Sequence, residues 1–421
     1  MLFLKKIKAG ALQYVLVISV VIGIIIFAFI SLIYLQQKMT LKHQFSKKAI
    51  HNTLAGFDYL RNNTIAYDEE KIFNFFDEKN TETAILKKHW GVFDLAIVTS
   101  KVKNEVFEKI GLLGVKNSER KALYLKDNNQ SLVLVGNTKI TGNAQLPKQG
   151  VKTGSIGGFS YYGNSLVNGI KTFSSNELPK IKNLAYLKNF FSSYQKQNIS
   201  EFELENNLKL HNSFTENTLL YEDENIVQLE NVSLSGNIIL VSKKSIHIKS
   251  TAKLKDVILI APEIIIESNV TGNFQAFANK KIIVGENCLL MYPTVLSLFE
   301  NNENQNSEKN KIEINQIKIA ENSEVRGVVL FETESISTNY NAQVSIEKNA
   351  IIKGEIYCAK NLDLQGSVFG SVYTSNFIVN KFGGIFVNHI YNGVINSKEL
   401  PLEYAGLQIH QDLNTVAKWL N

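Results

Sequence analysis

The sequence contains little arginine and little cysteine. Its 421 residues include three arginines, Arg61, Arg120 and Arg326, so lysine supplies nearly all of the positive charge. Arginine is the side chain best suited to bidentate recognition of phosphates and bases. The net charge is +6, but the lysines form no basic cluster. The composition therefore argues against a nucleic-acid partner.

The two cysteines, Cys288 and Cys358, are far apart and match neither a metal-ligand nor a redox spacing. Both lie in apolar runs typical of strands, which predicts small buried side chains. We expect free thiols, with a disulfide between the two as the alternative in an oxidising compartment.

Motifs for catalysis, metals and cofactors are also missing. The seven histidines show no two-histidine metal spacing, and neither His-Glu-x-x-His nor Gly-x-Ser-x-Gly occurs. The glycines of 154–158 are followed by neither the lysine nor the helix that a phosphate loop needs. Ser245 and His247 alternate in one expected strand, but no acidic partner is identifiable. We predict no catalytic residue, cofactor or metal site, and hence a protein that is not an enzyme.

A long apolar run is the clearest feature present. Residues 9–35 contain no charged side chain, and about 20 apolar residues suffice to cross a bilayer. A cleavable signal has a shorter apolar stretch and a small-residue cleavage site, which are not found here. We predict a retained transmembrane helix at 9–35, in contact with the lipid bilayer.

Its orientation follows from the short N-terminal tail. Lysines lie on both sides of the helix, but a long following domain is translocated largely regardless of its charge. We therefore expect residues 1–8 in the cytoplasm. The rest of the chain is then periplasmic or otherwise extracytoplasmic, attached to the bacterial inner membrane by a single pass.

A basic leader, then Gly10, then an apolar helix that continues as an amphipathic one resembles the type IV pilins and type II secretion pseudopilins. In that family a peptidase cuts after the glycine and the helix packs into a filament core. The resemblance implies processing at Gly10. The glutamate usually found five residues after the cut corresponds to Val15 here, a departure common in tip-type minor pseudopilins.

Residues 36–135 predict a small α+β domain next to the membrane, either pilin-like or an unrelated stalk. Apolar spacing extends the first helix to about residue 62, and a second short helix is expected at Asp68–Asp77. The period then changes to two, which predicts an antiparallel sheet. Its expected strands are Val92–Ser100, Glu105–Leu113, Ala122–Asp127 and Ser131–Val135, the last two joined by a turn.

The next region, 136–225, is rich in glycine at 136–169, where turns and short strands are expected. A helix predicted at Asn183–Gln197 forms an insertion or a packing element.

An internal repeat follows in residues 226–397. Its scheme is apolar-x-Gly-x-apolar-x-apolar, a short polar gap, then apolar-x-apolar. Such units cannot bury their inner faces alone and must stack on one another. The pattern predicts a parallel β-helix. One column of the repeat holds Gly236, Gly272, Gly327, Gly354 and Gly370, with Asp256 in the second unit, and we expect corners of the backbone there.

The repeat resembles the bactofilins and related polymer-forming β-helix proteins, which implies stacking of coils into filaments. Polar insertions are expected at 300–311 and Glu332–Ala342. Residues 398–421 predict a C-terminal cap in which Leu413, Val416, Ala417 and Leu420 follow helical spacing. The predicted fold is therefore mainly β: a transmembrane helix, a small α+β domain, and a β-helix with a helical cap.

Three functions stay open. The first is a structural or scaffold protein of the cell envelope, which includes a pseudopilin-like component that assembles with itself or with other envelope proteins. The second is a binding module for glycan or another surface. The third is a carbohydrate-active β-helix enzyme, for which the charged residues expected on the outer face are scattered. These residues are Lys255, Asp256, Arg326, Lys353, Glu355 and Asp363.

Overall fold

The computed structural model describes residues 10–77, 79–193, 199–300, 314–335, 339–409 and 413–420. The chain is mainly β, with one long N-terminal helix and a large parallel sheet. Its contacts divide it into two compact units. The first holds the chain up to Tyr59, Glu70–Leu86 and Val98–Lys109, and the second holds Leu60–Glu69, Lys87–Ile97 and the chain from Ile110.

Helix α1 spans Gly10–Asn62, and its 53 residues give a length of about 80 Å. An 18-residue window within it reaches a mean hydropathy of 3.2, and none of that window is buried. The chain therefore has one N-terminal helix long and apolar enough to span a membrane. The prediction that this helix continues to about residue 62 is confirmed.

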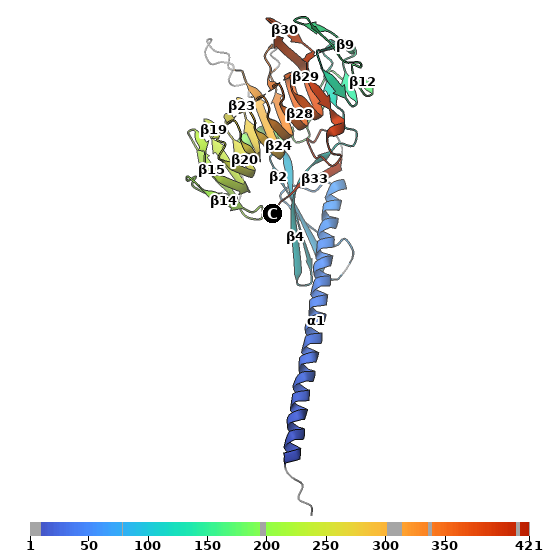
Figure 1. The fold of residues 1–421 in the computed structure, drawn as a ribbon, viewed down its shortest axis with the longest axis vertical. Helices are drawn as coiled ribbons and strands as arrows, with labels where there is room; N and C mark the ends of the chain where they lie inside the picture. The colour runs from blue at the N-terminus through green and yellow to red at the C-terminus, as the bar shows by residue number, and fades with distance from the viewer. Residues whose placement is uncertain are drawn as a thin grey trace, which may run out of the picture. The chain divides into compact units, whose positions relative to one another are not determined.

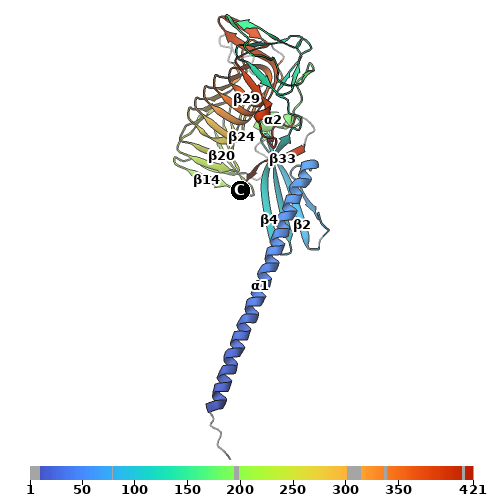
Figure 2. The same cartoon turned by 45° about the vertical axis from the view of Figure 1, so that its right-hand side comes forward.

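The C-terminal part of α1 packs within the first unit. Ala49 and Thr53 are fully buried, and the Thr53 hydroxyl donates to the carbonyl of Phe107 at 3.2 Å. Gly56 lies so close to Val98 that a Cβ atom there would stand 2.6 Å from a Val98 methyl. Figure 2 shows α1 running alongside β2 and β4.

A five-stranded sheet follows, in the order β1-β2-β3-β4-β33. β1 pairs antiparallel with β2, and β33 pairs antiparallel with β4. The expected strands at Val92–Ser100 and Glu105–Leu113 are confirmed as β3 and β4, whereas β2 was not predicted. The strands are β1 (Glu70–Phe73), β2 (Thr81–Trp90), β3 (Phe93–Val102), β4 (Glu105–Lys116) and β33 (Leu413–Leu420).

Two expected helices are strands instead. At Asp68–Asp77 the chain forms β1, because Asp68 and Asp77 both adopt a positive φ that ends regular structure, and β2 offers an edge to pair with. The predicted helix of the C-terminal cap is also wrong. Leu413–Leu420 is β33, whose backbone pairs with the edge of β4, and pairing with that edge overrides the helical spacing of the apolar residues.

The parallel sheet consists of three ladders, which we call A, B and C. Long strands bend from one ladder into the next. Ladder A contains β14 (Lys209–Asn212), β17 (Ser233–Gly236), the first parts of β20 (Lys253–Ile260), β22 (Thr271–Ala278), β24 (Leu289–Glu300), β26 (Glu324–Thr333), β28 (Ile351–Leu364) and β29 (Ser367–Lys381), then β32 (Val394–Asn396) and β7 (Lys139–Thr141).

Ladder B is built from the following parts of the same long strands. It contains β13 (Ile199–Glu201), β15 (Thr218–Asp223), β18 (Ile238–Ser242), β20, β22, β24, β26, β28 and β29, then β5 (Leu123–Leu125), β8 (Ala144–Leu146) and β12 (Lys171–Phe173).

Ladder C is shorter. It contains β16 (Val227–Leu229), β19 (Ser245–Ile248), β21 (Glu263–Ile266), β23 (Lys281–Val284), β25 (Gln316–Ile319), β27 (Val344–Ile346) and the last part of β28. A three-stranded parallel sheet contains β31 (His389–Tyr391), β6 (Leu132–Val135) and β9 (Val151–Thr153). The remaining elements are β10 (Ser155–Ile156), β11 (Phe159–Ser160), α2 (Leu184–Ser193), β30 (Gly384–Val387) and the 3-10 turn Ser397–Glu399.

The order of strands along the ladders differs from the order in the chain. β5 pairs in parallel with β29, and β8 and β12 follow beyond β5. The expected antiparallel pair of 122–127 with 131–135 is therefore wrong: β5 and β6 each join a parallel neighbour. Figure 1 shows β9 and β12 beside β29 and β30, although these segments are far apart in sequence.

Because β12 and β13 lie at opposite ends of ladder B, the chain between them returns along its outer face. The Tyr124 hydroxyl bonds to Ser175 at 2.8 Å, and Tyr357 donates to the Pro179 carbonyl at 3.2 Å. Further along, the α2 ring of Phe190 lies 4.7 Å from that of Phe277. The helix expected at Asn183–Gln197 is confirmed as α2, Leu184–Ser193; residues 194–198 lie outside the described residues.

Two apolar cores flank ladder B. The inner core is aliphatic and runs between the ladders, with residues such as Ile246, Leu259 and Leu296 at 0% exposure. The outer core covers the opposite face of ladder B with side chains such as Ile258, Phe277 and Leu330. Strands of a sheet that is buried on both faces are continuously apolar, and the part of β20 at Val257–Ile260 shows this pattern.

Candidate functional site

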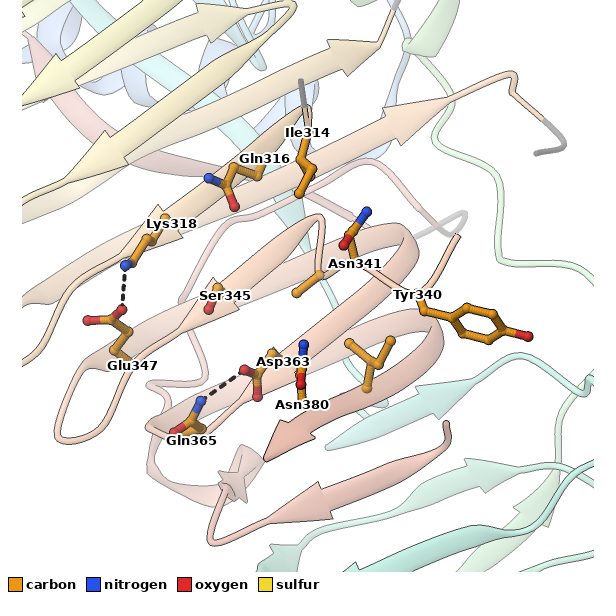
Figure 3. A pocket seen from close by; sticks show the side chains of 12 residues that line it. Ile314, Gln316, Lys318, Tyr340, Asn341, Ser345, Glu347, Asp363, Gln365 and Asn380 are labelled. Carbon is orange, nitrogen blue, oxygen red and sulfur yellow. Dashed lines mark hydrogen bonds and ion pairs between the residues drawn. The ribbon is translucent and has the colours of Figure 1, made fainter. Parts of the chain in front are cut away.

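A shallow groove lies on the outer face of ladder C. It has a volume of about 310 Å³ and is lined by residues of β25, β27, β28 and β29 and of the segments next to these strands. Figure 3 shows Tyr340 at one end and the pair of Lys318 and Glu347 at the other, with Asp363 between them.

The alternation of the strands explains why polar groups line this groove. Ile317, Ile346 and Leu364 point into the inner core and are at most 1% exposed. Their neighbours point outward, and Lys318, Ser345 and Asp363 form one row because the register places them opposite each other on β25, β27 and β28. The groove therefore carries a row of polar side chains across three neighbouring strands.

Its charges are largely compensated. Lys318 Nζ lies 2.7 Å from Glu347 Oε1. Gln365 Nε2 donates to Asp363 Oδ2 at 2.8 Å, whereas the buried Oδ1 of Asp363 has no hydrogen-bond partner among the described residues. Burial raises the pKa of Asp363. One enclosed oxygen of the Asp363 carboxyl group thus lacks a donor among the described residues.

The segment that carries Tyr340 is held in place by amide side chains. Asn361 Nδ2 donates to the carbonyls of Asn339 and Asn341, at 2.8 and 2.9 Å. The backbone N–H of Asn341 donates to Asn339 Oδ1, and the buried side chain of Gln343 donates to the same oxygen. Tyr340 itself remains 63% exposed. An exposed aromatic ring is therefore presented on a pinned loop.

A second polar cluster surrounds Asp94 in the second unit. The Asp94 side chain is 1% exposed and lies 2.9 Å from Lys87 Nζ. It also accepts hydrogen bonds from Tyr67 and Gln408, both at 3.1 Å. His89 Nδ1 lies 3.2 Å from the other carboxylate oxygen, Oδ1.

Aromatic rings enclose this cluster. The ring of His89 is stacked between those of Tyr67 and Tyr186, with centroid distances of 3.6 and 3.9 Å. Burial alone would raise the pKa of Asp94, but His89 and Lys87 outweigh it and hold the pKa below its usual range. Burial and the Asp94 charge raise the pKa of Tyr67. The contacts join five chain segments, which is the arrangement of a structural hub.

The charged residues expected on the outer face lie in different environments. Asp256 is paired with Lys418 at 2.5 Å and accepts from Asn273 at 2.7 Å. Glu355 does not lie on the surface: it is 3% exposed and accepts from the Leu407 amide at 2.8 Å. Asp363 alone of the six lines the groove.

The remaining candidates are spread over the surface. Arg326 and Lys353 both pair with Glu324, at 2.5 and 2.9 Å, and Lys255 is exposed. The hydroxyl oxygen of Ser245 lies 3.2 Å from Nε2 of His247. The described residues hold no group of three or more His, Cys, Asp or Glu side chains that could bind a metal ion.

The predicted glycine column lies where ladder A meets ladder B. Gly236, Gly327, Gly354 and Gly370 have φ between 92° and 152°, and a Cβ on each would stand within 2 Å of a carbonyl oxygen of the neighbouring parallel strand or the residue next to it. Gly272 lacks the positive φ, whereas Asp256 has φ of 62°. Gly10 is the first residue of α1, and residues 1–9 lie outside the described part of the chain.

Both cysteines are buried and free. Burial raises the pKa of the Cys358 thiol to about 12. A thiol that stays protonated is unreactive, so Cys358 serves as a small apolar group in the inner core.

No protein-family model matches the sequence, and comparison with curated proteins and with solved structures also gives no match.

Proposed function

We propose that this chain is a membrane-anchored structural protein of a bacterial cell envelope, and not an enzyme. In this proposal the three ladders are the faces of a parallel β-helix, which α1 attaches to the inner membrane with its N-terminus inside. An exposed helix of sufficient length and hydropathy supports the anchor. The helix followed by an antiparallel pairing of β1 with β2 supports a pseudopilin-like component.

The strand pairing at the two ends of the ladders is the main observation that supports a structural role. β12 pairs in register with β8, and β13 pairs with β15, but no register joins β12 to β13 in the described chain. Among the described residues, each end strand therefore has a register with a neighbour on one side only. Such edges are templates for a further strand.

Apolar side chains near these edges remain partly uncovered. At the β13 end, Phe202 and Leu210 pack on the inner core but stay partly exposed. At the β12 end, Ile170 and Phe173 are 67% and 70% exposed. A partner that covers either end would bury apolar surface as well as pair a strand.

The two ends also carry opposite charge. Residues 199–217 contain four glutamates and one lysine, a net charge of −3, whereas 147–173 contain three lysines and no acidic residue, a net charge of +3. Contact between like ends brings like charges together, but contact between unlike ends is attractive. We infer that copies of the chain associate head to tail, which gives an open assembly.

Charge reversal tests this assembly in the full-length protein in detergent micelles. The first variant carries Lys148→Glu, Lys152→Glu and Lys171→Glu, and the second carries Glu201→Lys, Glu203→Lys and Glu205→Lys. Sedimentation should show assemblies for the natural chain that shrink as salt screens the charges, and smaller species for each variant alone. Mixing the two variants should restore large species.

A matched control reverses three lysines on the sides of the ladders, Lys253, Lys255 and Lys281, and should leave assembly unchanged. Restoration by mixing is the decisive result, because it shows that assembly requires contact between ends of opposite charge, and in the natural chain only unlike ends have opposite charge. If the mixture stays as small as its components, head-to-tail assembly is wrong.

Membrane topology is tested separately. Protease added to intact spheroplasts should remove a C-terminal tag together with a periplasmic control protein. Survival of the tag while the control is degraded would refute export of the ladders.

A further inference from the structure

The first unit contains a corner between α1 and one end of its strands. We propose that this corner binds the phosphate headgroup of an anionic phospholipid, which Lys38 and Lys42 of α1 contact directly. A pocket at the end of the strands adds positive charge. It has a volume of about 450 Å³ and is lined by Asn80, Glu82, Lys101, Lys103 and Asn104. The inference rests on the proposed anchor, because it needs α1 to lie in a membrane, but it does not depend on the orientation of α1.

The strands of the first unit stop partway along α1. Lys103 lies in the turn between β3 and β4, and its Nζ stands 4.6 Å from the centre of the Phe45 ring. The Ser46 hydroxyl donates to Glu105, the first residue of β4, at 3.0 Å. Figure 1 shows this end of β4 beside α1. Because the apolar run ends at Leu35, the strands begin about 15 Å beyond it along the helix.

Lys38 and Lys42 continue the face of α1 that packs against the strands. On this face Ala49 is fully buried and Phe45 is half-buried. Residues seven positions apart lie on the same side of a helix, so Lys42 shares the side of Ala49, and Lys38 that of Phe45. Both lysines are exposed, because the strands end before they reach them. Helical side chains tilt toward the helix N-terminus, so the two lysines lean toward the apolar run.

The charge of this corner is not compensated. Neither Lys38 nor Lys42 has an ion pair in the described part of the chain, and residues 36–57 contain no acidic residue. In the corner as a whole, two acids, Glu82 in the pocket and Glu105 beside it, face four lysines, which leaves a net charge of +2. The corner therefore attracts an anion.

The position of the lysines favours a lipid as the source of this anion. Lys38 and Lys42 lie about 5 and 10 Å beyond Leu35 along the helix, at the level of the headgroup layer that borders the hydrocarbon. Lysines at such a surface are attracted to anionic lipids. The pocket lysines lie farther out and act through a field that salt screens over about 8 Å. A zwitterionic headgroup brings a cation of its own into the corner, so it is bound less tightly.

Native mass spectrometry of the full-length protein in micelles of an uncharged detergent tests the site. It measures the Kd for phosphatidylglycerol and for phosphatidylcholine with the same acyl chains, and phosphatidylglycerol should bind more tightly. Lys38→Gln with Lys42→Gln should weaken its binding about tenfold. Lys101→Gln with Lys103→Gln should weaken it about two- to threefold, because the pocket is farther from the apolar run.

The matched control, Lys47→Gln with Lys71→Gln, removes the same charge from the first unit. Lys47 is exposed on the opposite side of α1 from Lys38, and Lys71 is exposed on β1. Neither residue lines the pocket. This variant should leave both Kd values almost unchanged.

A preference for phosphatidylglycerol that is lost with Lys38 and Lys42 and kept in the control supports the proposal. Three results overturn it: equal Kd values for the two lipids, equal losses for the helix variant and the control, or displacement of the lipid by inorganic phosphate at a matched concentration. A chain that stays soluble without detergent would refute the anchor, whereas a micelle-bound chain without lipid preference refutes the lipid site alone.

Discussion

At the scale of single residues, the parallel ladders depend on positions where a side chain has no room. Gly354 and Gly370 are register partners on the parallel strands β28 and β29, and each has φ of 152°. A Cβ on Gly354 would stand 1.9 Å from the carbonyl oxygen of Gly327, and one on Gly370 would stand 1.8 Å from that of Gly354. Backbone packs directly on backbone there, so neither relaxation nor a rotamer change relieves the contact.

We therefore expect Gly354→Ala to lower the free energy of unfolding by about 2–5 kcal/mol, from strain in φ together with the clash. Gly383→Ala is the control, because Gly383 has φ of 74° but nothing within 4 Å of its Cβ position. It should cost about 1 kcal/mol. Thermal unfolding of the full chain measures both, and equal losses would contradict a steric role for the column.

Two buried glutamates make stability depend on pH. Burial raises the pKa of Glu332 and that of Glu355 to about 7. Between the ordinary glutamate pKa and 7 the folded chain holds protons that the unfolded chain releases, so folding loses stability as the pH rises. The loss is about 3 kcal/mol for each group by linkage.

Raising the pH from about 5 to about 8 should therefore lower the Tm, with the loss complete just above the folded pKa. The double variant Glu332→Gln, Glu355→Gln should flatten this dependence. Burial lowers the pKa of His389, so this residue makes the folded chain more stable as the pH rises. It is a single group, however, and opposes two glutamates. A Tm that rises over this range in the natural chain would contradict the assignment.

At the scale of elements, the second unit is held together by contacts between segments that are distant in sequence. The outer core fixes the return segment and α2 on ladder B, through rings such as those of Phe190 and Phe277. The Asp94 hub adds polar contacts among the loop before β1, β2, β3, α2 and the segment before β33. Losing a hub residue should therefore affect several elements at once.

Asp94→Ala should cost about 3–5 kcal/mol of unfolding free energy, because it leaves the buried Lys87 ammonium without its carboxylate. Replacing both partners, Lys87→Met with Asp94→Leu, should cost less than the single change. Chemical denaturation measures the difference. The control is Glu334→Ala, which breaks the exposed pair with Lys188 and should have little effect. A double variant less stable than Asp94→Ala would contradict this account.

At the scale of the whole molecule, the chain completes the ladders out of sequence order. Residues 122–173 extend the β29 end before the chain forms β13 at the other end. Interior strands such as β24 have parallel neighbours on both sides, whereas β12 and β13 have a parallel neighbour on one side only among the described residues. In stacked proteins stability is roughly a sum over such neighbour contacts.

Hydrogen exchange of the full chain, at a salt concentration that prevents assembly, should therefore be slowest in β22, β24 and β26. It should quicken toward β12, β13 and β14 at the ends. At low salt, head-to-tail assembly should slow exchange at the two ends and leave the interior unchanged. Uniform protection along the ladders would contradict both expectations.

Several elements were predictable because local pattern and tertiary role agree. The apolar run of α1 and the alternation in β3 and β4 are examples. β2 escaped prediction because its inward positions hold Thr81, Thr83 and Lys87, which are buried although polar. The hub around Asp94 has no sequence signal either, since its members are spread from Tyr67 to Gln408. The groove was foreseeable in part, as Asp363 was an expected outward residue.

The sequence by itself determined the long apolar helix, the mainly β character of the rest and the column of glycines, because each is set by composition or by a short-range period. The tertiary structure decided which edges pair. It turned Leu413–Leu420 into a strand along β4 and placed β5 and β6 in parallel ladders instead of a hairpin. It also buried Glu355 and placed Tyr340 and Asp363 along the same groove. Such pairings depend on contacts between distant segments, which no local period records.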